Sequence, residues 1–462
     1  MGERVPEGRP FLPAPPQGVL VEASPRLAAT GWCSACCPPA VGTVRTECPY
    51  TVFSLAEVRR LPRNSAFARR YRSCSPPSNV RISNQPVEGR RIDRFRPPHC
   101  PWPECPDHRP KKRYRCSKSG SYRRQADPRR RVPRFVCPTC GRTFSLQSFA
   151  CTYYLKRPEL LVPVAAGLVA GSAHAQIARS VKCNRSTVTR LAARLGRHAL
   201  LLQSLALQHL ETLEEPVVMD HFETFVFSQK DRLGIATPVG QKSWFIYGLD
   251  PAPHRQGGKR SARKRALQRP LPPKEPGAVM RSTRRVFDLL LGLSKGTVEI
   301  VSDDHPAYTH AASSADLRGS IHRRIYPNPP RGPGSDKGAA RERDRQMFPV
   351  DLLHKLWRHS QAHHRRETIA FGRRSNAVME RGFLLIVWRN FVKKISERSG
   401  EPLTPAMLRR LVPRPLEWSQ IFSARLFPGR IRLPRGWMKI YRRGWITPAV
   451  GRNLTHDLNH AF

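Results

Sequence analysis

Residues 217–227 read Val217-Val-Met-Asp220-His-Phe-Glu223-Thr-Phe-Val-Phe227, a largely apolar and β-branched stretch that predicts a β-strand. Two further strands are expected at 243–249 and 297–303, and a helix at about 283–293 precedes the third. Strands interrupted by a helix indicate a mixed α/β sheet. Asp220 lies inside the first strand and Asp303 at the carboxyl end of the third. Acidic residues are disfavoured in strands and costly in a core, so both are candidate functional residues.

A third carboxylate stands on a predicted helix over residues 375–396. At 100° per residue, the apolar side chains that lie within about 60° of Glu380 are Phe383, Leu384, Val387, Phe391 and Ile395. Asn376 points the same way one turn earlier. The alternative is a surface Glu380 paired with Arg381 or Arg373, but that requires another apolar face, and the helix has none. A carboxylate in the middle of an apolar face is costly unless it meets a cation.

Asp220, Asp303 and Glu380 follow one another at intervals of 83 and 77 residues. Three carboxylates in this order could converge on two divalent cations, and their hard oxygen ligands favour Mg²⁺ or Mn²⁺. Two such ions polarise a phosphodiester, activate an attacking hydroxyl and stabilise the leaving oxygen. The pattern therefore points to phosphoryl transfer on nucleic acid.

The charge balance points to the same partner. The 462 residues include 81 Lys and Arg against 34 Asp and Glu, which gives a formal charge of +47. A chain this basic is best tolerated beside a polyanion, because a nucleic-acid backbone neutralises the cations and releases its own counterions. The longest apolar run, 160–170, contains Pro163 and is about half of the ~20 residues that a membrane-spanning helix needs. No N-terminal signal pattern is found, so we expect no membrane and a cytoplasmic, nucleoid-associated, thiol-reducing location.

The cysteine spacing predicts a zinc ribbon over residues 96–150. Cys100 and Cys105 form one pair, and Cys137 and Cys140 form a second pair followed by Gly141. Four thiolates on two tight knuckles make a tetrahedral Zn²⁺ site, and a long basic chain without an export signal favours metal binding over disulfides. Three nearby residues could each replace one ligand: Cys116, His99 and His108.

A helix-turn-helix is predicted within residues 151–213. Residues 175–179 and 186–195 read as two helices around a turn at 181–184, with Ser186 as N-cap, and a linking helix follows at 195–213. The second helix has an apolar stripe at Val188, Leu191, Ala192 and Leu195. That stripe leaves five side chains for a duplex: Arg185, Thr187, Thr189, Arg190 and Arg194. An ordinary helical hairpin is the alternative interpretation.

Residues 1–95 differ from the rest. They are rich in proline and show no sustained helical or strand period, which predicts a disordered tail. Two interpretations stay open: upstream sequence added by an over-extended start, or a basic flexible segment that loosely binds nucleic acid.

The order of zinc ribbon, helix-turn-helix, Asp, Asp and Glu resembles the DDE-class insertion-sequence transposases of bacteria. The similar stretches are 134–145 for the ribbon, Ser302-Asp303-Asp304-His305-Pro306-Ala307-Tyr308 for the second aspartate, and 366–381 for the glutamate helix. The resemblance covers about residues 98–430. It implies a multidomain chain with an α/β ribonuclease H-like catalytic domain at 214–400 and a basic extension at 401–462.

Carried over by position, the resemblance makes Asp220, Asp303 and Glu380 the metal-binding catalytic triad. Asp304 is a rival for Asp303, Glu367 for Glu380 and Glu223 for Asp220. The chain departs from the family in a Pro/Gly-rich loop at 327–337 and in a basic insertion at 251–276. The insertion is expected to contact DNA phosphates through Lys259, Arg260, Arg263, Lys264 and Arg265.

These features predict a DNA transposase that binds double-stranded DNA at its element's ends, cleaves it and joins the 3′-hydroxyls to target DNA. Since two ends must be held together, a homodimer or larger assembly is expected. The alternatives are a non-catalytic zinc-ribbon and helix-turn-helix regulator, and an inactive transposase remnant.

Overall fold

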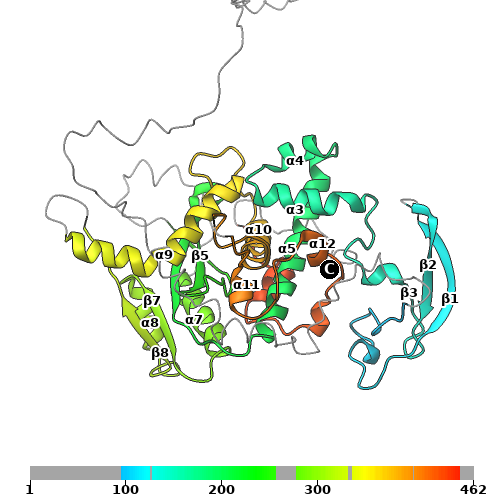
Figure 1. Ribbon diagram of the computed structural model, residues 1–462, viewed down its shortest axis with the longest axis horizontal. Coiled ribbons are helices and arrows are strands. Elements are labelled where there is room, and N and C mark those ends of the chain that lie inside the picture. The colour runs from blue at the N-terminus through cyan, green and yellow to red at the C-terminus, as the bar shows by residue number, and fades with distance from the viewer. Residues whose placement is uncertain (1–94, 125–126, 256–276, 331–335, 399, 448–462) are drawn as a thin grey trace, which may run out of the picture. The chain divides into compact units, whose positions relative to one another are not determined.

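The structure is a computed structural model that describes residues 95–124, 127–255, 277–330, 336–398 and 400–447 (Figure 1). The predicted tail at 1–95 lies outside the described residues except for residue 95. The predicted basic insertion lies largely outside them as well, including all five of its proposed DNA contacts: Lys259, Arg260, Arg263, Lys264 and Arg265. Within the described part of the chain, no helix is long and apolar enough to cross a membrane.

A five-stranded mixed sheet confirms the predicted α/β class. In chain order its strands are β4 (Val217–Val226), β5 (Ser228–Gly240), β6 (Asp250–Arg255), β7 (Val298–Ser302) and β8 (Ile321–Ile325). Across the sheet the order is β6-β5-β4-β7-β8. The first three pair antiparallel, whereas β7 runs parallel to β4 and β8 parallel to β7.

The strand predicted at 243–249 is wrong. The strand that pairs with β4 is β5, and 243–249 is an irregular buried segment with one isolated bridge, Val239 to Ile246. The side chain of Asn390 forms hydrogen bonds with the backbone of this segment. The Ile246 amide donates to Asn390 Oδ1 at 2.9 Å, and Asn390 Nδ2 donates to the Ile246 carbonyl at 2.9 Å. A short apolar run does not reveal by its period whether its backbone joins a ladder.

Three helices accompany the sheet: α7 (Ala278–Leu291), α8 (Pro306–Ala312) and α9 (Lys337–Ser360). The predicted helix at 283–293 corresponds to α7, which contacts β5 and β6 and buries Val286, Phe287 and Leu290. Helix α9 contacts β4, β5 and β7. It therefore lies over the strands that carry Asp220 and precede Asp303.

A helical group packs beside the sheet and shares its apolar core. It consists of α3 (Leu161–Val169), α4 (His174–Ser180), α5 (Arg185–Gln208) and α10 (Ser375–Val387), the last continued by a π-helical turn at Trp388–Val392. The helix predicted to reach Ser396 thus ends near Lys393. Helices α5 and α10 approach closely at Gly196, where a Cβ atom would lie 2.3 Å from the Glu380 carbonyl oxygen.

The cysteine-bearing segment forms a separate three-stranded antiparallel sheet, β1 (Ser117–Arg124), β2 (Asp127–Val136) and β3 (Thr143–Ser145). Its small core contains Phe135, Phe144 and Phe149, together with Phe427 from the C-terminal part of the chain. The remaining short elements are the 3₁₀ turns Pro106–His108, Leu146–Phe149, Pro158–Leu160, Ala362–His364 and Pro428–Arg430, and helices α11 (Pro405–Leu408), α12 (Trp418–Ile421) and α13 (Trp437–Tyr441).

Candidate zinc centre and carboxylate pair

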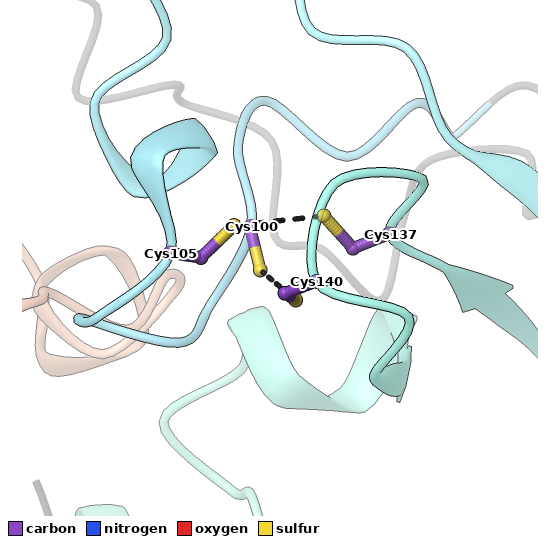
Figure 2. A group of neighbouring side chains, drawn as sticks. All are labelled: Cys100, Cys105, Cys137 and Cys140. Atoms are coloured by element: carbon purple, nitrogen blue, oxygen red, sulfur yellow. Dashed lines mark hydrogen bonds between the residues drawn. The ribbon is translucent and has the colours of Figure 1, made fainter.

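The four predicted cysteines meet at one point (Figure 2). Cys100 and Cys105 flank the turn before Pro106–His108, and Cys137 and Cys140 lie on the knuckle between β2 and β3. All four Sγ atoms lie within 4.8 Å of one another, with 3.8 Å from Cys100 to Cys140 and 3.7 Å from Cys105 to Cys137. Tetrahedral Zn²⁺ with bonds of about 2.3 Å needs sulfur atoms roughly 3.8 Å apart. The cluster could therefore bind a structural zinc ion.

The alternative ligands do not belong to this cluster. The rings of His99 and His108 each use Nδ1 to donate a hydrogen bond of 2.9 Å to the Cys100 carbonyl, so they support the first knuckle from outside. Cys116 is not part of the group. Burial acts to raise the pKa of Cys137, but hydrogen bonds from the Tyr114 hydroxyl and the backbone of Cys140 lower it to about 7. The Cys137 thiol therefore ionises readily, whereas burial raises the pKa values of Cys100 and Cys105, whose thiolates a bound Zn²⁺ would have to stabilise.

Helices α4 and α5 match the predicted pair, with α5 running unbroken to Gln208 through the predicted linker. The N-cap is Asn184 rather than Ser186, because the Asn184 side chain accepts from the Ser186 amide at 2.8 Å. Arg185, Thr189 and Arg190 are exposed at the start of α5, and Thr187 is half-buried.

Contrary to the prediction, Arg194 does not face solvent. Its Nη1 donates to the carbonyl oxygens of Cys151 at 2.8 Å and Tyr153 at 2.7 Å, so the side chain ties α5 to the segment before α3. Burial lowers the pKa of Arg194 to about 10. Of the predicted DNA contacts of α5, those that remain available to a duplex therefore lie in its first two turns.

Asp220 lies in β4, and Asp303 directly follows the neighbouring parallel strand β7. Val217 and Val218 of β4 pair with Ile300 and Val301 of β7. The ladder ends at Val218 and Val301, and the same register continued by two residues would bring Asp220 opposite Asp303. Burial, and then the nearby charge of Asp303, raise the pKa of Asp220 to about 7. The charges of the two carboxylates therefore act on each other, and their binding of a shared cation stays a prediction.

Polar groups hold both carboxylates in place. Asp220 Oδ1 accepts from its neighbour's backbone amide at 2.7 Å and from the Tyr308 hydroxyl at 3.3 Å. The Tyr308 hydroxyl also lies 2.8 Å from His221 Nδ1. Asp303 accepts from the His305 amide at 3.1 Å and from Asn328 Nδ2 at 3.3 Å. Tyr308 is thus the side chain that links the first strand to the second-aspartate motif.

The rivals of these two aspartates fit less well. Asp304 is exposed and falls out of register with Asp220. Glu223 is exposed too, and its Oε2 lies 3.2 Å from His254 Nε2. Asp303 and Asp220 are therefore the better candidates for a shared ligand.

Glu380 does not join the aspartate pair. It is buried as predicted, with 2 % of its surface exposed, but its Oε1 lies 2.9 Å from Nε of Arg443, and Arg197 of α5 adds a second nearby cation. Among the described residues, the only group of three or more metal-type ligands gathered within 4.8 Å is the cysteine cluster. The predicted meeting of three carboxylates is thus not found, because the cation beside Glu380 is an arginine. Glu367, its rival, is exposed in a loop.

Asn376, one turn before Glu380, binds the same C-terminal segment. Its Nδ2 donates to the carbonyls of Arg443 at 3.0 Å and Trp445 at 2.7 Å, and its Oδ1 accepts from the Trp445 amide at 3.2 Å. Asn376 and Glu380 together fasten residues 443–445 to α10.

Asp351 is an acidic neighbour that the sequence reasoning missed. It lies on α9 and its charge raises the pKa of Asp220, after the larger effects of burial and Asp303. His354, three residues on and so on the same helix face, places Nδ1 3.8 Å from Asp220 Oδ2. Asp351 itself is bound by Arg343 of the same helix. The sequence signal that could have identified this pair is the spacing of Asp351 and His354, three residues apart among apolar residues of one helical turn.

A scan against protein-family models gives no match, and a comparison with curated proteins gives none. The inference of function therefore depends on the geometry of these sites.

Proposed function

We propose that the protein is a DNA transposase that cleaves the ends of its own element and joins the freed 3′-hydroxyls to target DNA. The observation that carries the proposal is that Asp220 of β4 lies close enough to Asp303, which directly follows the adjacent parallel strand β7, for their charges to interact. It is supported by the transposase-like motif at 302–308, by the ribbon and helix pair that precede the sheet, and by the net charge of +47.

The donor set suits Mg²⁺ or Mn²⁺. Two carboxylates that repel each other, as the raised pKa of Asp220 indicates, are stabilised by a hard divalent cation held between them. Bound there, such a cation would polarise a phosphodiester and lower the pKa of a bound hydroxyl. The Tyr308 hydroxyl orients Asp220, and Asn328 and the His305 amide orient Asp303.

The proposed site consists of the aspartate pair. The resemblance assigns Glu380 as a third ligand, but this carboxylate is engaged by Arg443. Asp351 is the second carboxylate, after Asp303, whose charge acts on Asp220. A ribonuclease H-like fold remains part of the proposal, supported by the mixed sheet, and so does assembly into a dimer or larger complex.

A non-catalytic DNA-binding regulator is the second candidate. The observation that favours it is the ion pair of Glu380 with Arg443, which occupies the carboxylate that the proposed cation site would need as its third ligand. Both candidates require duplex binding, and Arg185 and Arg190, exposed at the start of α5, are suited to contact a duplex.

Strand transfer distinguishes the two candidates. The full-length protein is incubated with Mg²⁺ or Mn²⁺, a labelled duplex carrying the flanking ends of its own element, and supercoiled target DNA. A transposase yields labelled product joined to the target, and chelation by EDTA abolishes it. End binding without nicking or joining in either metal would contradict the proposal and support the regulator.

The affinity for Mn²⁺ should rise with pH. Asp220 has a pKa of about 7 in the metal-free fold, so below pH 7 the metal must displace a proton, and affinity should increase about tenfold per pH unit before levelling off. His221 and His354, whose pKa values are lowered by burial to about 3, stay neutral across this range and do not contribute. Titration calorimetry with Mn²⁺ between about pH 6 and about pH 8, about one unit either side of 7, measures this. A flat profile would argue against Asp220 as a ligand.

A further inference from the structure

The β1–β2 hairpin of the ribbon holds two arginines directly opposite each other. Arg123 of β1 pairs in register with Arg131 of β2, and both side chains are exposed. Like charges at opposed positions of an antiparallel pair destabilise it. Among the described residues neither guanidinium has an acidic partner. Within the described residues, the opposed pair therefore lacks a neutralising carboxylate, and an external anion could supply the missing negative charge.

The arginine pair lies on the outer face of the hairpin. The adjacent register pair is Tyr122 and Val132. Val132 is buried in the ribbon core, and the Tyr122 hydroxyl lies 3.3 Å from Ser145 Oγ of β3. Successive side chains of a strand point to opposite faces, so Arg123 and Arg131 lie on the face opposite Val132 at this end of the hairpin, and both are exposed.

The rest of the ribbon surface does not neutralise this charge. Its exposed acidic side chain outside the hairpin is Glu104, which pairs with Arg142 at 3.6 Å. Further cations are exposed on the strands and on the loop that precedes them: Lys111, Lys112, Arg113, Lys118 and Arg134. Charge complementarity therefore favours a polyanion over a protein surface of mixed charge.

We propose that this hairpin is a second duplex-binding element, in which Arg123 and Arg131 bind phosphates of DNA whose major groove receives the ribbon. The inference rests on the proposed function, because it names a surface through which the transposase holds DNA. A two-stranded ribbon fits the major groove of B-form DNA, which is about 12 Å wide. The guanidinium fork matches phosphate oxygens. The major groove of A-form RNA is too narrow for side chains to enter, which favours DNA.

The test is the salt dependence of duplex binding by the full-length chain. Each phosphate neutralised contributes about 0.9 to the slope of log affinity against log salt. Arg123→Gln/Arg131→Gln should therefore reduce the slope by about 1.8 and weaken binding by about 30-fold at about 0.15 M salt. Fluorescence anisotropy on a labelled duplex measures both. Arg123→Lys/Arg131→Lys, which keeps the charge, should retain most of the slope.

A charge-matched control separates the hairpin from net charge. Arg345→Gln/Arg410→Gln also removes two exposed arginines, which here are paired with Glu342 and Glu211, and should leave the slope unchanged. Zinc content checks that each hairpin variant keeps its ribbon. Three results would overturn the inference while the proposed function stands. They are an unchanged salt slope in the Arg123→Gln/Arg131→Gln variant, an equal loss of slope in the control variant, and a loss of slope that is seen only with duplex RNA. Absence of duplex binding by the wild-type protein overturns both.

Discussion

Asp303→Asn should abolish cleavage and strand transfer while leaving the protein folded. The amide keeps the shape of the carboxylate but removes the negative charge that would hold the cation beside Asp220. Loss of an outer-shell partner of a metal typically costs 10–100-fold, so loss of a direct ligand should cost on the order of 10³-fold, or about 4 kcal/mol. Stability should be unchanged or slightly higher, because one of two repelling carboxylates is gone.

Single-turnover nicking of an end duplex, with thermal unfolding measured in parallel, checks this expectation. Asp304→Asn is the matched control, because it makes the same change at the adjacent exposed position, outside the register of Asp220. It should keep activity within a few-fold of wild type. Full activity in Asp303→Asn would remove the basis of the proposed site.

Glu380→Gln should lower the stability of the fold, whereas Asp303→Asn should lower activity. It tests the finding that Glu380 belongs to an ion pair and not to the cation site. It removes one partner of a buried ion pair and leaves Arg443 close to Arg197 without the carboxylate, which typically costs about 3–5 kcal/mol of stability. Pairing it with Arg443→Met should recover much of that loss, and a double-mutant cycle measures the coupling. If Glu380→Gln loses activity with stability intact, Glu380 acts as the resemblance implied.

The cysteine set and the aspartate pair could be predicted because each depends on local pattern. Two cysteine pairs with short spacers can fold only into tight knuckles, and the cluster follows from bringing the two knuckles together. Asp220 and Asp303 follow apolar strand residues, and adjacent parallel strands bring such positions side by side.

Other features depended on contacts distant in sequence. The helical wheel correctly predicted that Glu380 is buried, but its partner Arg443 lies 63 residues further on, in a segment interpreted only as a basic extension. The wheel also placed Arg194 outside the apolar stripe, yet the carbonyls that bind it belong to Cys151 and Tyr153. A wheel shows which face of a helix is apolar, and not which polar groups of other segments meet it.

Cys137→Ser should unfold the ribbon while the rest of the chain stays folded. The ribbon core is small, and apparent binding free energies of structural zinc are about 10–16 kcal/mol, so the metal would supply most of the stability of such a unit. The C-terminal segment should loosen with it, because Arg425 donates to the Ser148 carbonyl at 3.0 Å and Arg430 donates to the His108 carbonyl. Helices α5 and α10 pack in the other core and should keep their protection.

Hydrogen exchange and zinc content of the full-length protein measure this outcome. The wild-type chain should hold one zinc per molecule, and Cys137→Ser should lose zinc together with protection at 95–150 and 425–430. Cys116→Ser is the matched control, since Cys116 lies in the same ribbon outside the cluster and should keep both. Loss of zinc in Cys116→Ser but not in Cys137→Ser would show that the ligand set is different. Because duplex binding by the hairpin requires a folded ribbon, Cys137→Ser should also lower the salt slope at least as much as Arg123→Gln/Arg131→Gln does.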